Sequence, residues 1–196
     1  MMAGFLKWLL IAAVRLLAQP RWLGSRPGGE QCIYVANHTS HLDTLLLLAS
    51  LPAALRNCTR PVASEEYWDA YPVRRYLIRS VFRGVLLARR EGLSNPLQPA
   101  ADALRQGDSL IFFPEGTRGS GRKLQPLKPG ILHLSQWFPE IDVIPVWIDG
   151  SYRSLPKGFV VPLPRRCSIT FGTPMHVKGE EFLAELRDAL EGLRPL

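Results

Sequence analysis

The chain has 196 residues, of which 46% are hydrophobic and 21% are charged, and its formal net charge is +7. These values exclude a disordered or low-complexity chain and predict one globular domain with ample length for a core. The three cysteines, Cys32, Cys58 and Cys167, are widely spaced, which disfavours a disulfide framework or a zinc knuckle and fits a reducing compartment. The basic balance suits nucleic acid, an anionic membrane surface or a phosphorylated substrate.

The N-terminal segment is apolar from Phe5 to Ala18, and Lys7 and Arg15 interrupt it. It is too short for an ordinary transmembrane helix, which needs about 20 predominantly apolar residues. Arg15 also breaks the apolar run that a signal peptide keeps continuous. Two interpretations stand about equal: a helix lying in a membrane interface with its basic side toward the headgroups, and a helix that packs on the domain.

The rest of the chain alternates short apolar runs with amphipathic segments. Strands are expected at residues 31–36, 84–88, 109–113, 143–148 and 167–171. Helices are expected at residues 40–50, 72–82, 96–106, 129–137 and 180–193. This alternation predicts an α/β domain with a largely parallel central sheet covered by helices. We therefore assign residues 1–24 to an amphipathic, membrane-associating helix and residues 25–196 to a single domain. Within the second expected helix, Arg75, Arg79 and Arg83 recur every four residues and predict one basic stripe.

The first motif that carries chemistry is Asn-His-Thr-Ser-His-Leu-Asp at residues 37–43, between an expected strand and an expected helix. Ligands and catalytic groups gather at such turns of open α/β sheets. His38 can act as a general base near neutral pH, with Asp43 fixing its tautomer. Five residues turn about 140° on an ideal helix, so the two side chains meet only if His38 precedes the helix. The alternative is a capping box from Ser40 to Asp43, and a metal site at His38 and His41 ranks lower.

The second motif is Phe-Pro-Glu-Gly-Thr-Arg-Gly at residues 113–119, directly after an expected strand. Arg118 can bind a phosphate through two parallel hydrogen bonds, and Glu115 can accept a hydroxyl or orient Arg118. Gly116 allows close approach of the backbone. The alternative is a charged turn with a local Glu115–Arg118 pair. A P-loop is excluded, because Lys-Ser/Thr does not follow the second glycine of the spaced pair.

Two further segments are ordinary sheet elements on their own: Gly-Val-Leu-Leu-Ala-Arg, which ends at Arg89, and Val-Ile-Pro-Val at residues 143–146. In this order, the four segments together resemble the motifs of the 1-acylglycerol-3-phosphate acyltransferase family over residues 31–173. The resemblance implies transfer of an acyl chain from an acyl-coenzyme A or acyl-carrier-protein thioester to the hydroxyl of a lysophospholipid. The acceptor it implies most directly is 1-acylglycerol-3-phosphate, which gives phosphatidic acid at the cytoplasmic face of the membrane.

The resemblance also implies residue roles, with residues 25–196 as the acyltransferase domain. His38 is the general base, Asp43 is its orienting partner, and His41 occupies a variable position of the motif. The implied substrate-binding residues are Arg89, Glu115, Gly116, Thr117 and Arg118. The chain departs from the family at residues 63–66, which read Ala-Ser-Glu-Glu where many members carry a lysine.

The resemblance implies three partners: a lysophospholipid acceptor, an acyl thioester donor and an anionic membrane surface, and no nucleic acid. A thioester is already activated, so neither a metal nor another cofactor is expected. Two other functions stay open. One is a thioesterase-like hydrolase that uses the same His–Asp pair, and the other is a non-catalytic module that binds membranes or nucleic acid.

Overall fold

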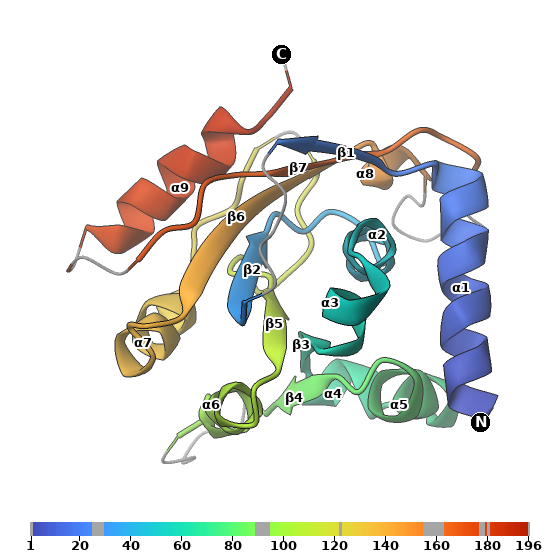
Figure 1. Ribbon diagram of the computed structural model, residues 1–196, viewed down its shortest axis with the longest axis horizontal. Helices are drawn as coiled ribbons and strands as arrows, with labels where there is room; N and C mark the ends of the chain where they lie inside the picture. The colour runs from blue at the N-terminus through green and yellow to red at the C-terminus, as the bar shows by residue number, and fades with distance from the viewer. Residues whose placement is uncertain are drawn as a thin grey trace.

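The computed structural model describes residues 2–24, 30–88, 95–121, 123–154, 163–176, 179 and 181–195. Within them, seven strands form one sheet in the order β1-β7-β6-β2-β5-β3-β4 (Figure 1). The strands are β1 (Arg21–Gly24), β2 (Cys32–Ala36), β3 (Thr59–Ser64), β4 (Val85–Leu87), β5 (Ser109–Phe112), β6 (Asp142–Asp149) and β7 (Ser168–Phe171). The α-helices are α1 (Met2–Ala18), α2 (Asp43–Ser50), α3 (Ala53–Asn57), α4 (Glu65–Trp68), α5 (Pro72–Tyr76), α6 (Gln98–Arg105), α7 (Gly130–Trp137), α8 (Ser151–Ser154) and α9 (Phe182–Gly192).

The sheet is largely parallel. Strands β2 to β6 pair in parallel, β7 runs antiparallel to β6, and β1 is parallel to β7. Each of the five expected strands is present within a residue or two of its expected ends. The α/β class with a helix-covered, largely parallel sheet is therefore confirmed, and β1 and β3 are strands that the sequence did not predict.

Helices cover both faces of the sheet. Side chains of β2 alternate, so that Cys32, Tyr34 and Ala36 join one apolar cluster while Ile33 and Val35 join another. The first cluster packs beneath α1 and α2, and the second beneath α6, α7 and α9 (Figure 1). Because β2 is buried on both faces, its sequence is a continuous apolar run.

The basic residues of α1 point toward the domain. Lys7 Nζ donates to the carbonyl of Arg56 at 3.4 Å, and the Arg15 guanidinium donates to the carbonyl of Ala49 at 2.8 and 3.1 Å. Both carbonyls lie near the C-terminal ends of short helices, where cations are favourable. The expectation that this basic side faces lipid headgroups is therefore wrong, because the two cations are used to dock α1.

The opposite side of α1 is an exposed apolar face. Ile11, Val14 and Ala18 are buried against the domain, whereas Phe5 and Trp8 are 66% and 62% exposed. The other large exposed side chains of this face are Met2, Leu9 and Leu16. Among the described residues, no helix is both long and apolar enough to cross a membrane.

The expected basic stripe after Pro72 does not form as one row. Helix α5 passes into a π-helical turn, η1 (Leu77–Val81), which ends before Arg83, so only Arg75 and Arg79 keep a common side. Arg79 pairs with Asp69 at 2.6 Å, and Arg75 lies 3.6 Å from the same carboxylate. Arg83 falls beyond the helix with a φ of 53°.

Candidate active site

The two motifs meet at the carboxyl edge of the sheet. Strands β2 and β5 are parallel neighbours, with Val35 opposite Phe112, so the residues that follow them leave the sheet side by side. His38 and Glu115 therefore come from separate strand ends and lie next to each other. Strand β6 ends at the same edge on the other side of β2.

His38 and Asp43 form a pair, which their spacing allows because His38 precedes α2. His38 Nδ1 lies 2.8 Å from Asp43 Oδ2, with the imidazole 21% exposed and the carboxylate fully buried. The same oxygen accepts hydrogen bonds from the backbone N–H groups of Thr39 and Ser40 at 2.6 and 2.8 Å. Asp43 thus satisfies backbone donors and also binds the imidazole, so the two interpretations of this motif coexist. Because a carboxylate only accepts, Nδ1 carries the proton and Nε2 keeps a free lone pair.

The second motif holds the main chain and ring of His38. The backbone N–H of His38 donates to Glu115 Oε1 at 2.6 Å, and the N–H of Gly119 donates to the His38 carbonyl at 2.8 Å. The imidazole stacks on the Phe113 ring with 4.2 Å between centroids. His38 is therefore fixed through its backbone, its ring face and Nδ1, which leaves Nε2 as the ring atom able to react.

The Glu115 carboxylate is bound by backbone N–H groups and not by Arg118, the partner that the motif suggested. Its side chain is buried, and Oε2 accepts a second backbone hydrogen bond from the N–H of Gln125 at 2.9 Å. Burial raises the pKa of this carboxyl, while the two backbone donors partly offset that rise. The carboxylate therefore ties the His38 turn to the loop at Gln125 and does not pair with Arg118.

Arg118 has no polar partner among the described residues. Its side chain is partly exposed, and no described residue forms a hydrogen bond or ion pair with its guanidinium. Gly116 turns with a φ of 65°, where a Cβ would lie 2.8 Å from the end of the Lys128 side chain, and Thr117 is exposed. Arg89 lies outside the described residues.

A third group of side chains borders this site, and no motif indicated it. His41 Nε2 lies 3.0 Å from the hydroxyl of Tyr67, and their rings stack. The Arg74 guanidinium lies over the Tyr67 and Tyr71 rings, at 4.4 and 4.8 Å from their centroids. His41 is exposed at the surface, and partial desolvation by its neighbours, followed by the positive charge of Arg118, lowers its pKa to about 4. Arg74 acts on His41 in the same direction, so two guanidinium groups lie near one neutral imidazole.

The His38 turn is also tied to the β6 side of the sheet. The Asn37 amide donates to the carbonyl of Ile148 at 3.0 Å and accepts from its N–H at 2.7 Å. Thr39 Oγ1 lies 2.8 Å from the hydroxyl of Ser151, the first residue of α8. The His38 turn is therefore held from both neighbouring strands.

Comparisons with known proteins agree with this geometry. The family model described as Acyltransferase matches residues 19–149. A 1-acyl-sn-glycerol-3-phosphate acyltransferase of Limnanthes alba is 30% identical, over 72% of this chain and 50% of that protein. A lyso-ornithine lipid O-acyltransferase of Pseudomonas aeruginosa is 32% identical, over 74% of this chain and 52% of that protein.

A solved structure shows the same fold. The crystal structure of the 1-acyl-sn-glycerophosphate acyltransferase PlsC from Thermotoga maritima matches with a TM-score of 0.75 and 25% identity, covering 97% of this chain and 79% of that one. The chain spans about half the length of the curated relatives it matches. The chain therefore belongs to the acyltransferase family, and the resemblance to the 1-acylglycerol-3-phosphate acyltransferases predicted from its motifs is confirmed.

Proposed function

We propose that this chain transfers an acyl group from a thioester to the hydroxyl of 1-acylglycerol-3-phosphate, giving phosphatidic acid. The observation that carries the proposal is the arrangement around His38. Its Nδ1 is bound to Asp43 at 2.8 Å, and its backbone is held by the loop that presents Arg118. A base and an unpaired cation on adjoining loops suit an acceptor whose hydroxyl and phosphate lie a few bonds apart.

The reaction needs one base and no covalent intermediate. Nε2 of His38 takes the proton of the acceptor hydroxyl as its oxygen attacks the thioester carbonyl carbon. The C–S bond then breaks, and the proton passes from His38 to the leaving sulfur. The products are an ester and a free thiol. Asp43 stabilises the imidazolium that forms between these steps, as a buried carboxylate at Nδ1 does in other His–Asp pairs.

The acceptor phosphate binds Arg118 and Arg74 in this proposal. Both guanidinium groups lie within electrostatic range of His41, three residues from His38, which supports a shared role in binding the phosphate. The rings of Tyr67 and Tyr71 hold Arg74, which lowers the entropy that a phosphate contact costs. Because His41 is neutral at pH 7, it adds no charge and can hydrogen-bond the ligand or Tyr67.

The apolar face of α1 supports attachment of the site to a lipid surface. Phe5, Trp8 and Leu16 project from the domain on a helix whose other side is docked through Lys7 and Arg15. A rigidly held helix with aromatic and aliphatic side chains outward lies in the acyl-headgroup boundary of a bilayer. This orientation supports attachment to the cytoplasmic face of the membrane, where a lysophospholipid acceptor resides and a soluble thioester arrives.

A matrix of donors and acceptors tests this function. Purified chain is mixed with acyl-coenzyme A or acyl-carrier-protein donors and with lysophosphatidic acid, lyso-ornithine lipid or no acceptor, and products are identified by mass spectrometry. We expect phosphatidic acid only with lysophosphatidic acid present. Free fatty acid formed at the same rate without acceptor would show a thioesterase. Acylation of lyso-ornithine lipid alone would overturn the phosphate acceptor, and no product from any pair would favour a binding module.

A further inference from the structure

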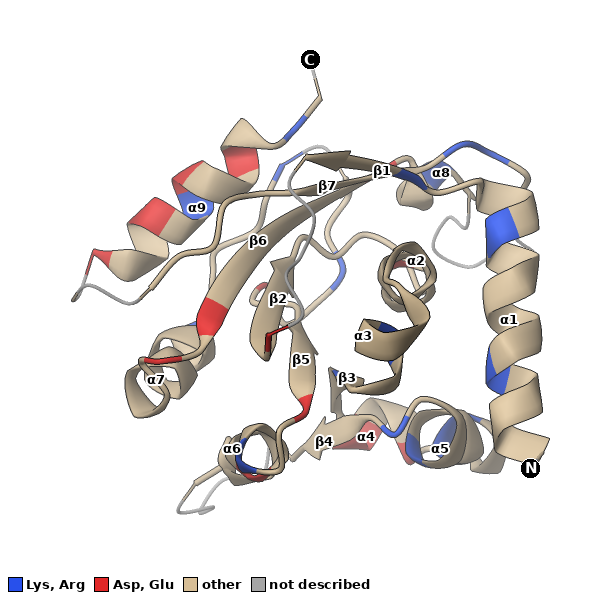
Figure 2. Ribbon diagram, in the orientation of Figure 1, with Lys and Arg blue, Asp and Glu red and all other residues tan. Residues whose placement is uncertain are grey.

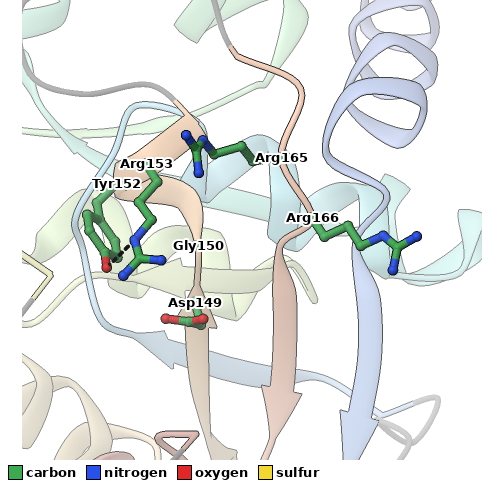
Figure 3. Close-up of a pocket in the computed structure, with 6 residues that line it drawn as sticks. All are labelled: Asp149, Gly150, Tyr152, Arg153, Arg165 and Arg166. Carbon is green, nitrogen blue, oxygen red and sulfur yellow. Dashed lines mark hydrogen bonds between the residues drawn. The ribbon is translucent and has the colours of Figure 1, made fainter.

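A second basic site lies on the β6 side of the sheet. A cavity of about 270 Å³ opens where β6 ends and β7 begins. Figure 3 shows Arg165 turned toward Arg153, with Asp149 below them and Arg166 extending the lining toward α1. The lining residues are Asp149, Gly150, Tyr152, Arg153, Arg165 and Arg166. The guanidinium groups of Arg153 and Arg165 therefore lie together beside one carboxylate, while Arg166 lines the edge of the cavity and its side chain extends away from them.

The arginines of this cavity are not used by the fold. Arg165 and Arg166 are exposed, and no described carboxylate pairs with Arg153, Arg165 or Arg166. Arg153 Nε donates to the Tyr152 hydroxyl at 2.6 Å, and its guanidinium lies 5.2 Å from the centroid of that ring. Asp149 is the one carboxylate of the lining and pairs with none of these arginines, so the excess positive charge suits an anion with several negative oxygens.

The chain brings these residues together through the antiparallel strand β7. Asp149 pairs with Ser168, so the segment just before β7 returns to the edge where β6 ends. Figure 2 shows basic residues gathered at α8, at the chain before β7 and at the start of β1, whereas α9 carries several acidic residues. Arg21 is the basic residue at that start of β1, whose N–H donates to the Cys167 carbonyl. One group of basic residues therefore lies at this corner of the molecule.

The cavity is coupled to the candidate active site. Ser151 contacts Thr39, the residue after His38. The Tyr152 ring packs against Gly121, where a Cβ would lie only 2.8 Å from the ring, so α8 also touches the loop that carries Arg118. In the sheet order, β2 lies between β5 and β6. His38 is therefore flanked by Arg118 on one side and by the arginine cavity on the other.

We propose that this cavity binds the phosphate groups of the acyl donor, coenzyme A. The identification of the ligand as coenzyme A rests on the proposed function, whereas the binding of a phosphate anion by the cavity does not. The acceptor has its phosphate a few bonds from the reacting hydroxyl, so it fits the Arg118 side, whose loop hydrogen-bonds His38 directly. Coenzyme A separates its thioester from its phosphates by a long pantetheine arm, so its phosphates suit a cavity that reaches the His38 turn only through α8.

Lipid headgroup phosphates offer the same chemistry, and binding measurements separate the two sources. Free coenzyme A, pantetheine and inorganic phosphate are titrated into the full chain, and sedimentation with phosphatidylglycerol vesicles is measured in parallel. We expect coenzyme A to bind at least tenfold more tightly than pantetheine, which lacks phosphate. The double variant Arg165→Gln/Arg166→Gln should weaken coenzyme A binding about ten- to a hundredfold, because it removes charge-assisted hydrogen bonds.

Two single variants control for charge and fold. Asp149→Asn removes the carboxylate of the cavity and should strengthen coenzyme A binding about two- to fivefold. Arg194→Gln removes an exposed positive charge near the end of α9, outside the cavity, and should leave binding unchanged. Thermal midpoints equal to wild type establish that the double variant is folded.

Several outcomes would overturn the proposal. If the folded double variant binds coenzyme A as tightly as wild type, the cavity is not the coenzyme A site. A variant that loses vesicle sedimentation but keeps coenzyme A affinity would assign the cavity to lipid phosphate and refute the donor. Two further outcomes distinguish failure of the proposed function from failure of the cavity. If wild-type chain shows no transfer while coenzyme A affinity still depends on Arg165 and Arg166, the cavity stands without that function. Normal transfer with an unaltered donor KM in the variant would leave the function and refute the cavity.

Discussion

Replacing Glu115 by glutamine tests whether this carboxylate positions His38 or contacts the acceptor. In the structure its two oxygens accept from the backbone N–H groups of His38 and Gln125 at 2.6 and 2.9 Å. Glutamine keeps the shape of the side chain but replaces one acceptor oxygen by an NH2 group, which faces an N–H donor. One buried hydrogen bond is then lost, and the other loses its charge.

The loss can be estimated from these contacts. A hydrogen bond to a charged group contributes about 1.5–3 kcal/mol, and a buried N–H left unpaired costs about 1–3 kcal/mol. We expect Glu115→Gln to lower the free energy of unfolding by about 2–4 kcal/mol. For a domain of this size, that corresponds to a fall of roughly 4–16 °C in Tm. A displaced His38 should also lower kcat by up to about a hundredfold, because small errors in the position of a catalytic group are costly.

The assay combines thermal unfolding with transfer kinetics in which donor and acceptor are varied separately. The matched control is Glu140→Gln, which removes an exposed carboxylate that makes no hydrogen bond or ion pair with the described residues. The control should keep both Tm and kcat, whereas Glu115→Gln should lose both with little change in acceptor KM. A Glu115→Gln protein with wild-type Tm and kcat but a raised acceptor KM would show that Glu115 contacts the acceptor, and the positioning role would be wrong.

Three further predictions follow from the described contacts. Arg118→Lys should raise the acceptor KM roughly ten- to a hundredfold and leave the donor KM nearly unchanged, because lysine cannot form two parallel hydrogen bonds with one phosphate; a selective rise in donor KM would place Arg118 on the donor. The pKa of His41 falls from 6.5 to about 4 on folding, so its stabilising contribution is complete above pH 6.5 and is lost as the pH falls toward 4. Urea midpoints of His41→Gln should therefore fall less steeply than wild type between pH 6.5 and 4, and equal slopes would contradict this. Phe5→Ser/Trp8→Ser should reduce sedimentation with vesicles while transfer to detergent-dispersed acceptor persists, and unchanged sedimentation would mean that this face does not meet the bilayer.

The sheet could be predicted where its strands are apolar and buried on both faces. Residues 31–36 and 109–113 are continuous apolar runs, and they form the central neighbours β2 and β5. Strand β3 was missed because its sequence contains Arg60 and Pro61, which argue against an interior strand. Arg60 is accommodated by Asp108 at 3.1 Å, a partner 48 residues away that no local pattern indicates.

The same limit applies to the site. The His38–Asp43 contact could be predicted, because both groups lie in one turn and their spacing allows only a few geometries. Other features depend on segments that tertiary packing brings together. They are the burial of Glu115, the stacking of Arg74 on two tyrosine rings and the arginine cavity. Helical periodicity separated the two faces of α1 but could not decide which one packs, because Lys7 and Arg15 find carbonyl partners only in the folded domain.

The account depends most on His38 as the base that activates the acceptor hydroxyl, and the kcat of folded His38→Ala tests this claim directly. We expect its rate of phosphatidic acid formation to fall by about 10²–10⁴ while the protein still unfolds cooperatively, because a lost general base is not replaced by its neighbours. His41→Gln, three residues along the same turn, serves as the matched control and should keep substantial activity. Wild-type-like transfer by folded His38→Ala, or an equally deep loss in His41→Gln alone, would contradict the assignment.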